Sequence, residues 1–201
     1  MPVKRGTPGG AEVASGAMRD VGGPWHGQWM ETLRLRPWSD DDLPLLRAAN
    51  TADMTTHLNG PESEQQVEER HRRYLGLDPT EARMFAVLDA HDVPVGAIGY
   101  WTVEWRDESA FETGWFVLPA AQGRGVASSA LALLIEDARA HPAGLGYLVA
   151  FPAVENAASN GVCRRAGFEL VGSSAGRFRG SELHSHEWAL DLHPRRDRVE
   201  T

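Results

Sequence analysis

Residues 119–128, Pro-Ala-Ala-Gln-Gly-Arg-Gly-Val-Ala-Ser, decide how the rest of the chain is interpreted. An apolar run at residues 115–118 precedes this stretch, and apolar residues at helical spacing follow it as far as Ala138. The pattern predicts a buried strand, a glycine-bearing turn and the start of a helix. Backbone N–H groups at a helix start have no intrahelical acceptor, so such a turn favours binding of an anion.

Three kinds of phosphate-binding loop combine glycine with a helix start. A nucleoside-triphosphate loop has Lys and then Ser or Thr after its last glycine, whereas Val126 and Ala127 follow Gly125 here. A dinucleotide-binding fingerprint has a third glycine, and Ser128 stands at that position. The remaining kind reads Q/R-x-x-G-x-G/A, and Gln122, Gly125 and Ala127 match each of its fixed positions.

That last pattern, with two further blocks, resembles the acetyl-CoA-binding region of the GNAT superfamily of N-acetyltransferases. Upstream, residues 111–115 (Phe-Glu-Thr-Gly-Trp) are similar to the strand that leads into the family's loop. Downstream, residues 156–159 (Asn-Ala-Ala-Ser) and 166–168 (Ala-Gly-Phe) resemble the family's N-x-x-S and GF block at the expected spacing. Residues 31–37 and 187–190 are similar to the subgroup of ribosomal-protein N-terminal acetyltransferases.

The chain has 201 residues, which suits one domain with a substantial core. Residues 1–29 are rich in Gly, Pro and Ala without periodicity, and we predict a flexible tail there. The acetyltransferase domain is expected at 30–193 and a short C-terminal tail at 194–201, since the resemblance covers about 31–192. No apolar core follows the basic N-terminal residues and no long apolar run occurs, so we expect neither a signal peptide nor a membrane partner.

The periodic patterns predict the element order β-α-α-β-β-β-α-β-α-β-β, an α/β layout with meandering strands first. The resemblance implies a GNAT fold, with a mixed, mostly antiparallel central sheet, splayed parallel strands and flanking helices. The expected strands are 32–36, 84–88, 93–103, 111–118, 147–151, 168–171 and 187–192, and the expected helices follow Ser39, Ser63, Gly125 and Asn156.

Composition narrows the class of partner. The formal net charge of -8 argues against a nucleic-acid partner, which would favour a basic face. The acidic balance is compatible with a cationic amine, although charge that only maintains solubility explains it equally well. The single cysteine, Cys163, forms no internal disulfide, so a cytoplasmic location fits best. Monomer and homodimer both remain open.

The resemblance implies acetyl-CoA as co-substrate and no metal. In the family this molecule occupies a notch where two parallel strands splay apart, and those strands would be 111–118 and 147–151. Backbone groups near the end of the first strand would hold the pantetheine arm, and amides of the loop would hold the pyrophosphate. The predicted contacts are Phe116, Val117, Leu118, Gln122, Gly123, Arg124, Gly125, Val126, Ala127, Ser128, Asn156 and Ser159.

Deprotonation of the acceptor amine needs a base. Glu112 is the first candidate, because the family often has a Glu at this strand; a surface or salt-bridged carboxylate is an equally good explanation. Glu104, His184 and His186 are weaker candidates, the two histidines lying in a polar stretch expected before the last strand. Their His-x-His spacing suggests metal binding, but no third ligand stands nearby.

One position departs from the family. The usual general acid is a Tyr four residues before the Gly of the GF pair, and Cys163 stands there. We expect it to be a core residue, since a buried Cys behaves as a small hydrophobe. The resemblance suggests a protein N-terminus as acceptor, with a small-molecule amine (a polyamine, an aminoglycoside or an amino-acid-like antibiotic) as the alternative. A non-catalytic acyl-CoA-binding domain is the rival from another class.

Overall fold

The computed structural model describes residues 33–178 and 181–193, so both predicted tails lie outside the described residues. The predicted order of elements is confirmed. The strands are β1 (Arg34–Pro37), β2 (Ala82–Leu88), β3 (Pro94–Trp105), β4 (Glu108–Val117), β5 (Tyr147–Ala150), β6 (Glu169–Phe178) and β7 (Ser181–Asp191); the helices are α2 (Leu43–Ala49), α3 (Glu64–Leu75), α4 (Val126–Arg139) and α5 (Ala157–Arg165).

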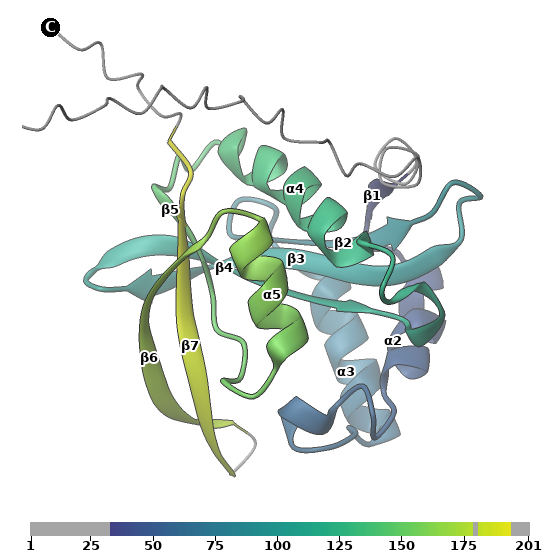
Figure 1. The fold of residues 1–201 in the computed structure, drawn as a ribbon. Coiled ribbons are helices and arrows are strands. Elements are labelled where there is room, and N and C mark those ends of the chain that lie inside the picture. Colours follow the sequence, from purple (N-terminus) through teal and green to yellow (C-terminus); the bar gives the residue numbers. More distant parts are fainter. Residues whose placement is uncertain (1–32, 179–180, 194–201) are drawn as a thin grey trace, which may run out of the picture.

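The strands form one seven-stranded sheet in the order β1-β2-β3-β4-β5-β7-β6 (Figure 1). Among the described strands, β4 and β5 pair in parallel and every other neighbouring pair is antiparallel. The crossover between β4 and β5 is the loop and helix α4, which a parallel connection requires. The expected mixed, mostly antiparallel α/β sheet is therefore confirmed.

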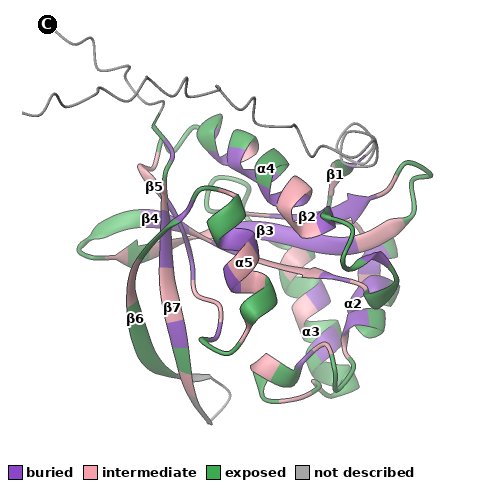
Figure 2. Ribbon diagram, in the orientation of Figure 1, coloured by how far each residue is buried: buried purple, intermediate pink, exposed green. Residues whose placement is uncertain are grey.

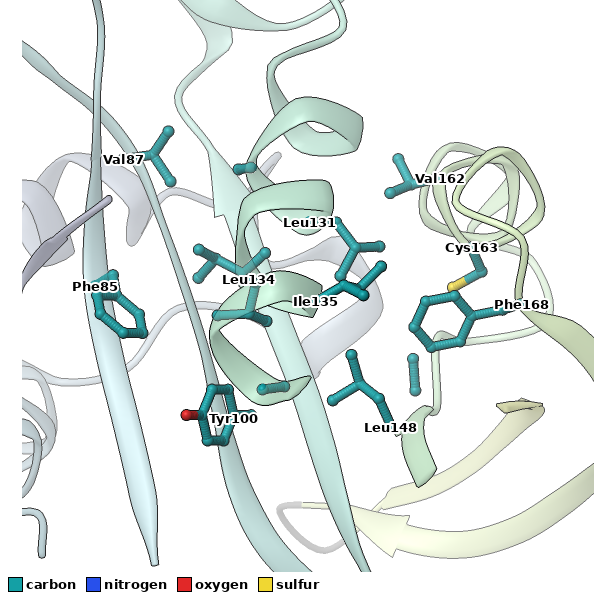
Figure 3. Packing of buried hydrophobic residues seen from close by; sticks show 14 of the residues in the cluster. Phe85, Val87, Tyr100, Leu131, Leu134, Ile135, Leu148, Val162, Cys163 and Phe168 are labelled. Carbon is teal, nitrogen blue, oxygen red and sulfur yellow. The ribbon is translucent and has the colours of Figure 1, made fainter. Parts of the chain in front are cut away.

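Helices cover both faces of the sheet. Helices α4 and α5 pack on one face (Figure 1), where Leu131 and Leu134 of α4 lie over Tyr100 of the sheet (Figure 3). Phe111 of β4 belongs to the same buried cluster. Helices α2 and α3 pack on the other face over β2 and β3, and Leu46 is fully buried there. Figure 2 shows the helices buried on the side that meets the sheet and exposed on the other. The apolar stripes predicted from the sequence are these inner sides.

Capping residues begin the first two helices as predicted. Ser39 and Asp42 form a capping box ahead of α2, and Asp42 is buried in an ion pair with Arg36, whose Nη2 lies 2.6 Å from Oδ1. Ser63 caps α3, and Gln66 returns the bond to the Ser63 backbone N–H at 2.8 Å. Such caps satisfy N–H groups that a helix start leaves without partners.

The last two strands are longer than the sequence suggests. β6 runs to Phe178 and β7 begins at Ser181, so His184 and His186 lie inside β7 and not in a turn before it. Glycine and serine dominate residues 172–176, and these residues have low intrinsic strand preference. Pairing of the two strands with each other extends them beyond what their residue preferences indicate, with one register irregularity between Leu170 and Gly172.

Candidate active site

The two parallel strands touch over a short distance. Phe111 pairs with Leu148 and Glu112 pairs with Val149, and beyond these pairs the strands separate. β4 continues alongside β3 as far as Val117, so among the described strands none lies beside the other edge of its last residues. This is the splayed arrangement expected from the sequence. It opens a notch between the C-terminal ends of β4 and β5.

Glycines shape the loop that leads from this notch into α4. Gly123 and Gly125 have φ of 73° and 80°, a left-handed conformation that other residues avoid. A Cβ added at either position would meet no atom within 4 Å, so the space above the loop is open to a ligand. Ser129 N–H bonds back to the Gly125 carbonyl at 3.0 Å. The preceding amides of α4, at residues 126–128, come too early for an intrahelical acceptor.

Two arginines and a serine surround this helix start. Arg124 is exposed within the loop. Arg165, at the end of α5, places Nε 3.4 Å from Ser128 Oγ in the first turn of α4. The sequence motif includes Arg124 and Ser128, but nothing in it indicates that α5 adds a second cation. Two guanidinium groups and a helix N-terminus together favour phosphate oxygens.

Gln122, the first fixed residue of the motif, turns its side chain back toward the protein. Its Nε2 donates to the Val117 carbonyl at 2.8 Å and lies 3.3 Å from Met54 Sδ. The Leu118 N–H donates to the Val95 carbonyl at 2.8 Å and is thereby committed to the sheet. Of the three backbone positions predicted at the end of β4, Leu118, which directly follows the strand, therefore offers its carbonyl and not its amide.

Glu112 lies at the last residue pair that β4 and β5 share. It is partly buried, and its Oε2 accepts a hydrogen bond from Trp101 Nε1 at 3.2 Å. Burial raises the pKa of the Glu112 carboxyl, and the Trp101 hydrogen bond opposes that rise. Among the described residues, Glu112 forms no ion pair. The structure therefore contradicts the alternative that Glu112 is a salt-bridged carboxylate.

Strand alternation assigns Glu112 to the face that carries α2 and α3. Phe116, four residues along β4, packs with the cluster under these helices, whereas Phe111 packs with α4 on the opposite face. The carboxylate and the start of α4 thus lie on different sides of the sheet, with the notch between them. Two reactants can approach such a notch from its two sides.

His186 is held by the side chain of Asn160 on α5. The Asn160 Nδ2 group donates to the Ala153 and Asn156 carbonyls at 2.9 and 2.8 Å, so its oxygen faces β7. That oxygen lies 2.8 Å from His186 Nδ1 and 2.8 Å from Trp188 Nε1. An amide oxygen only accepts, so neutral His186 carries its proton on Nδ1 and has a lone pair on Nε2.

His184 is exposed and lies two residues away along the same strand. Its backbone carbonyl accepts from Val154 N–H at 3.0 Å, which ties β7 to the segment that follows β5. Among the described residues no group of three or more His, Cys, Asp or Glu side chains is arranged to hold a metal ion. The described helices also include none that is long and apolar enough to cross a membrane.

The motif residues at and around α5 cap the helix and pack in the core, which the motif alone does not reveal. Asn156 caps the helix, since its Oδ1 accepts from Ser159 N–H at 3.0 Å. Cys163 is fully buried beside Phe168 (Figure 3), and burial raises its pKa to about 12. The thiol therefore remains protonated and packs in the core, as expected from the sequence.

Comparison with known proteins connects this geometry to an activity. The family model described as "Acetyltransferase (GNAT) domain" matches residues 32–169. An L-methionine sulfoximine/L-methionine sulfone acetyltransferase of Pseudomonas aeruginosa is 35% identical over 131 residues, which cover 62% of this chain and 75% of that protein. The counterpart from Pseudomonas paraeruginosa is 33% identical over the same shares of the two chains.

Solved structures share the fold at lower sequence identity. RimL, a ribosomal L7/L12 α-N-protein acetyltransferase in complex with coenzyme A, has a TM-score of 0.66 at 21% identity, over 80% of this chain and 94% of its own. The spermidine N-acetyltransferase of Vibrio cholerae, with coenzyme A and spermine, has a TM-score of 0.67 at 20% identity, over 81% and 96%.

Proposed function

This chain belongs to the GNAT family of acetyltransferases, and on that basis we propose that it transfers the acetyl group of acetyl-CoA to the primary amine of a small, amino-acid-like acceptor. The observation that carries the proposal is the open, glycine-lined start of α4 beside the notch between β4 and β5. The acceptor class rests on the two Pseudomonas relatives, whose names specify methionine sulfoximine and methionine sulfone.

The chain fits a co-substrate with phosphates at one end and a thin arm. The amides of residues 126–128, with Arg124 and Arg165 beside them, suit the pyrophosphate. The open edge of β4 suits the amide groups of the pantetheine arm, as an added strand would. Acetyl-CoA supplies the thioester, and the chain's own groups position it in the notch.

Glu112 is suited to remove the proton from the acceptor amine. A primary amine has a pKa near 10 in water, so at neutral pH it arrives as an ammonium. The carboxylate attracts this cation and takes one proton, and the freed lone pair attacks the thioester carbonyl. The C–S bond then breaks, the electron pair leaves on sulfur, and the nitrogen gives up its remaining extra proton to the thiolate or to solvent as the amide forms. A pKa raised by burial brings the carboxylate closer to the pH at which a general base works best.

The leaving thiolate does not require a proton donor. A thiol has a pKa of about 8.5, so the thiolate is a competent leaving group. Cys163 holds its proton too tightly and is enclosed by core residues, so it is not the donor. His186, with its proton on Nδ1 directed at Asn160, would need to become an imidazolium before Nε2 donated.

A panel of amines tests the acceptor class. Release of free coenzyme A should be measured with methionine sulfone, methionine sulfoximine, spermidine and a short peptide that has a free N-terminus. We expect kcat/KM to be highest for the two amino-acid analogues. A higher value for the peptide would favour the protein N-terminus. Acetyl-CoA binding without turnover of any amine would instead support the non-catalytic alternative.

We also propose that the protein is cytoplasmic. A single cysteine that is buried and carries no disulfide suits a reducing cytoplasm, where acetyl-CoA would be the available acyl donor. Localisation of the tagged protein in fractionated cells, followed by immunoblotting, tests this part separately from the chemistry.

A further inference from the structure

A tryptophan on the neighbouring strand holds the carboxylate of Glu112. Trp101 of β3 and Glu112 of β4 are directly opposite each other in the antiparallel pair. Directly opposed side chains share a face of the sheet and lie close together. The indole Nε1 donates to Oε2 at 3.2 Å, and among the described residues this is the only hydrogen bond that the carboxylate accepts.

A glycine provides the place for the indole ring. Gly114, two residues beyond Glu112 on the same face, has no side chain, and a Cβ built there would lie 3.1 Å from Trp101 Cη2. That distance is tighter than ordinary packing, so any larger residue would push the ring away from the strand. The ring therefore lies across Gly114 with its N–H directed toward Glu112. The contact between Trp101 and Glu112 thus depends on the missing side chain at position 114, which a chance contact between exposed side chains would not need.

Resting on the role proposed for Glu112, we propose that Trp101 is a positioning residue: it holds Oε2 of Glu112 and leaves Oε1 to receive the proton of the acceptor amine. A carboxylate with both oxygens free would rotate and present either oxygen in many directions. Holding one oxygen fixes the plane of the group, which places the other within reach of a bound amine more of the time.

Apart from burial, this hydrogen bond is the main local influence on the pKa of the carboxyl. Strand alternation places Arg83 of β2 on the opposite face, where its guanidinium pairs with Asp137 of α4 at 3.1 Å. Glu104 of β3 alternates to that same opposite face, and Glu108 is exposed at the distant start of β4. Arg70 on α3 is engaged with Glu62 at 2.6 Å. Removal of the indole N–H should therefore change the pKa of Glu112 directly, because none of these charged groups lies beside the carboxyl.

The test replaces the donor and keeps an aromatic ring. Trp101→Phe removes the hydrogen bond that favours the charged carboxylate, so the pKa of Glu112 should rise by about one pH unit, the shift that a charge-assisted hydrogen bond produces. A carbon-13 NMR titration of the Glu112 carboxyl in the protein without acetyl-CoA measures this directly. Trp105→Phe is the matched control, because Trp105 Nε1 has no hydrogen-bond partner in the described structure.

Kinetics then separate this inference from the proposed function. If both hold, the lower apparent pKa in the kcat/KM profile moves upward in Trp101→Phe and stays in place in Trp105→Phe, and kcat falls more than KM changes. An NMR shift without a kinetic shift would mean that Trp101 holds a carboxylate that is not the base, which overturns the proposed role of Glu112. Equal NMR values in Trp101→Phe, Trp105→Phe and the unaltered protein would overturn the role of Trp101.

Discussion

At the scale of single residues, Glu112 combines two features that rarely coexist on a merely structural carboxylate. It is partly buried at the end of the shared β4–β5 pairing, and no cation balances its charge among the described residues. Burial of a charge costs stability unless a partner offsets it. A carboxylate in such surroundings is a candidate for chemistry.

Replacement of Glu112 by Gln keeps the shape of the side chain and removes its basicity. We expect turnover to slow by roughly 10²–10⁴-fold, which is the usual effect of losing a general base. Acetyl-CoA affinity should remain close to that of the unaltered protein. The loss of turnover should shrink at high pH, where more of the amine is already neutral. Steady-state kinetics across neutral and alkaline pH, with calorimetry of acetyl-CoA binding, provides both measurements.

The same variant has a signature in stability. A carboxyl whose folded pKa is raised contributes favourably when it is protonated, and this contribution disappears as the pH rises through that pKa. Glu112→Gln should therefore melt at a higher temperature than the unaltered protein in mildly alkaline buffer and at nearly the same temperature in acidic buffer. If turnover at neutral pH is unchanged, Glu112 is structural, and His186 becomes the next base to test.

Cys163 provides the contrasting case, a residue at a functional position of the family that has become part of the core. Cys163→Ala should leave turnover within about tenfold of the unaltered protein, because the buried thiol keeps its proton at neutral pH. Thermal melting should reveal the missing sulfur as a small loss of stability. If turnover instead slowed by roughly 10²–10⁴-fold, the thiol would be a general acid.

At the scale of elements, the loop and the first turn of α4 act together. Gly125 is the N-cap of α4, and its left-handed φ and open surroundings leave the helix amides accessible. Gly125→Glu should abolish acetyl-CoA binding, since a side chain would fill the open space and its charge would repel phosphate. Isothermal titration calorimetry measures the loss.

A matched variant controls for backbone strain. Gly167 also has a left-handed φ, of 86°, is exposed, and has no atom within 4 Å of an added Cβ. Gly167→Glu should therefore cost similar stability and leave acetyl-CoA binding intact. If both variants bind acetyl-CoA as tightly as the unaltered protein does, the pyrophosphate does not lie at the start of α4.

What the sequence predicts well is local. The strand, glycine turn and helix around residues 115–138 follow from hydrophobic periodicity and glycine placement, and the helix expected after Asn156 is α5. The hairpin of β6 and β7 is longer than predicted because cross-strand pairing extends its strands. Sequence periodicity is weak for such strands, which are rich in small and polar residues.

The site is predictable to a similar extent. The loop and Glu112 carry local signals, whereas the partners of the candidate residues come from distant parts of the chain. Asn160 meets His186 across 26 positions, and Arg165 meets Ser128 across 37. The contact between Trp101 and Glu112 depends on the register of β3 with β4, which one sequence does not specify.

At the scale of the whole molecule, the first 28 residues are predicted to be dispensable for folding. Their composition is rich in glycine and proline without the periodicity of a core element. A chain that begins at Trp29 should melt within a few degrees of the full chain and retain its acetyl-CoA affinity. Scanning calorimetry of the two proteins provides the comparison; a larger decrease in Tm would mean that the segment contributes to the packed core.

The short parallel contact between β4 and β5 has a consequence for folding cooperativity. Strands β1 to β4 form one half of the sheet and β5 to β7 the other, and their backbones are joined where residues 111 and 112 meet 148 and 149. A ligand that occupies the notch touches both halves and would act as the missing length of strand. Amide hydrogen exchange at residues 147–150 should slow markedly when acetyl-CoA is bound, while exchange at the centre of the β2–β3 pair changes little. The two halves of the sheet would then unfold together when acetyl-CoA fills the notch and more independently when the notch is empty.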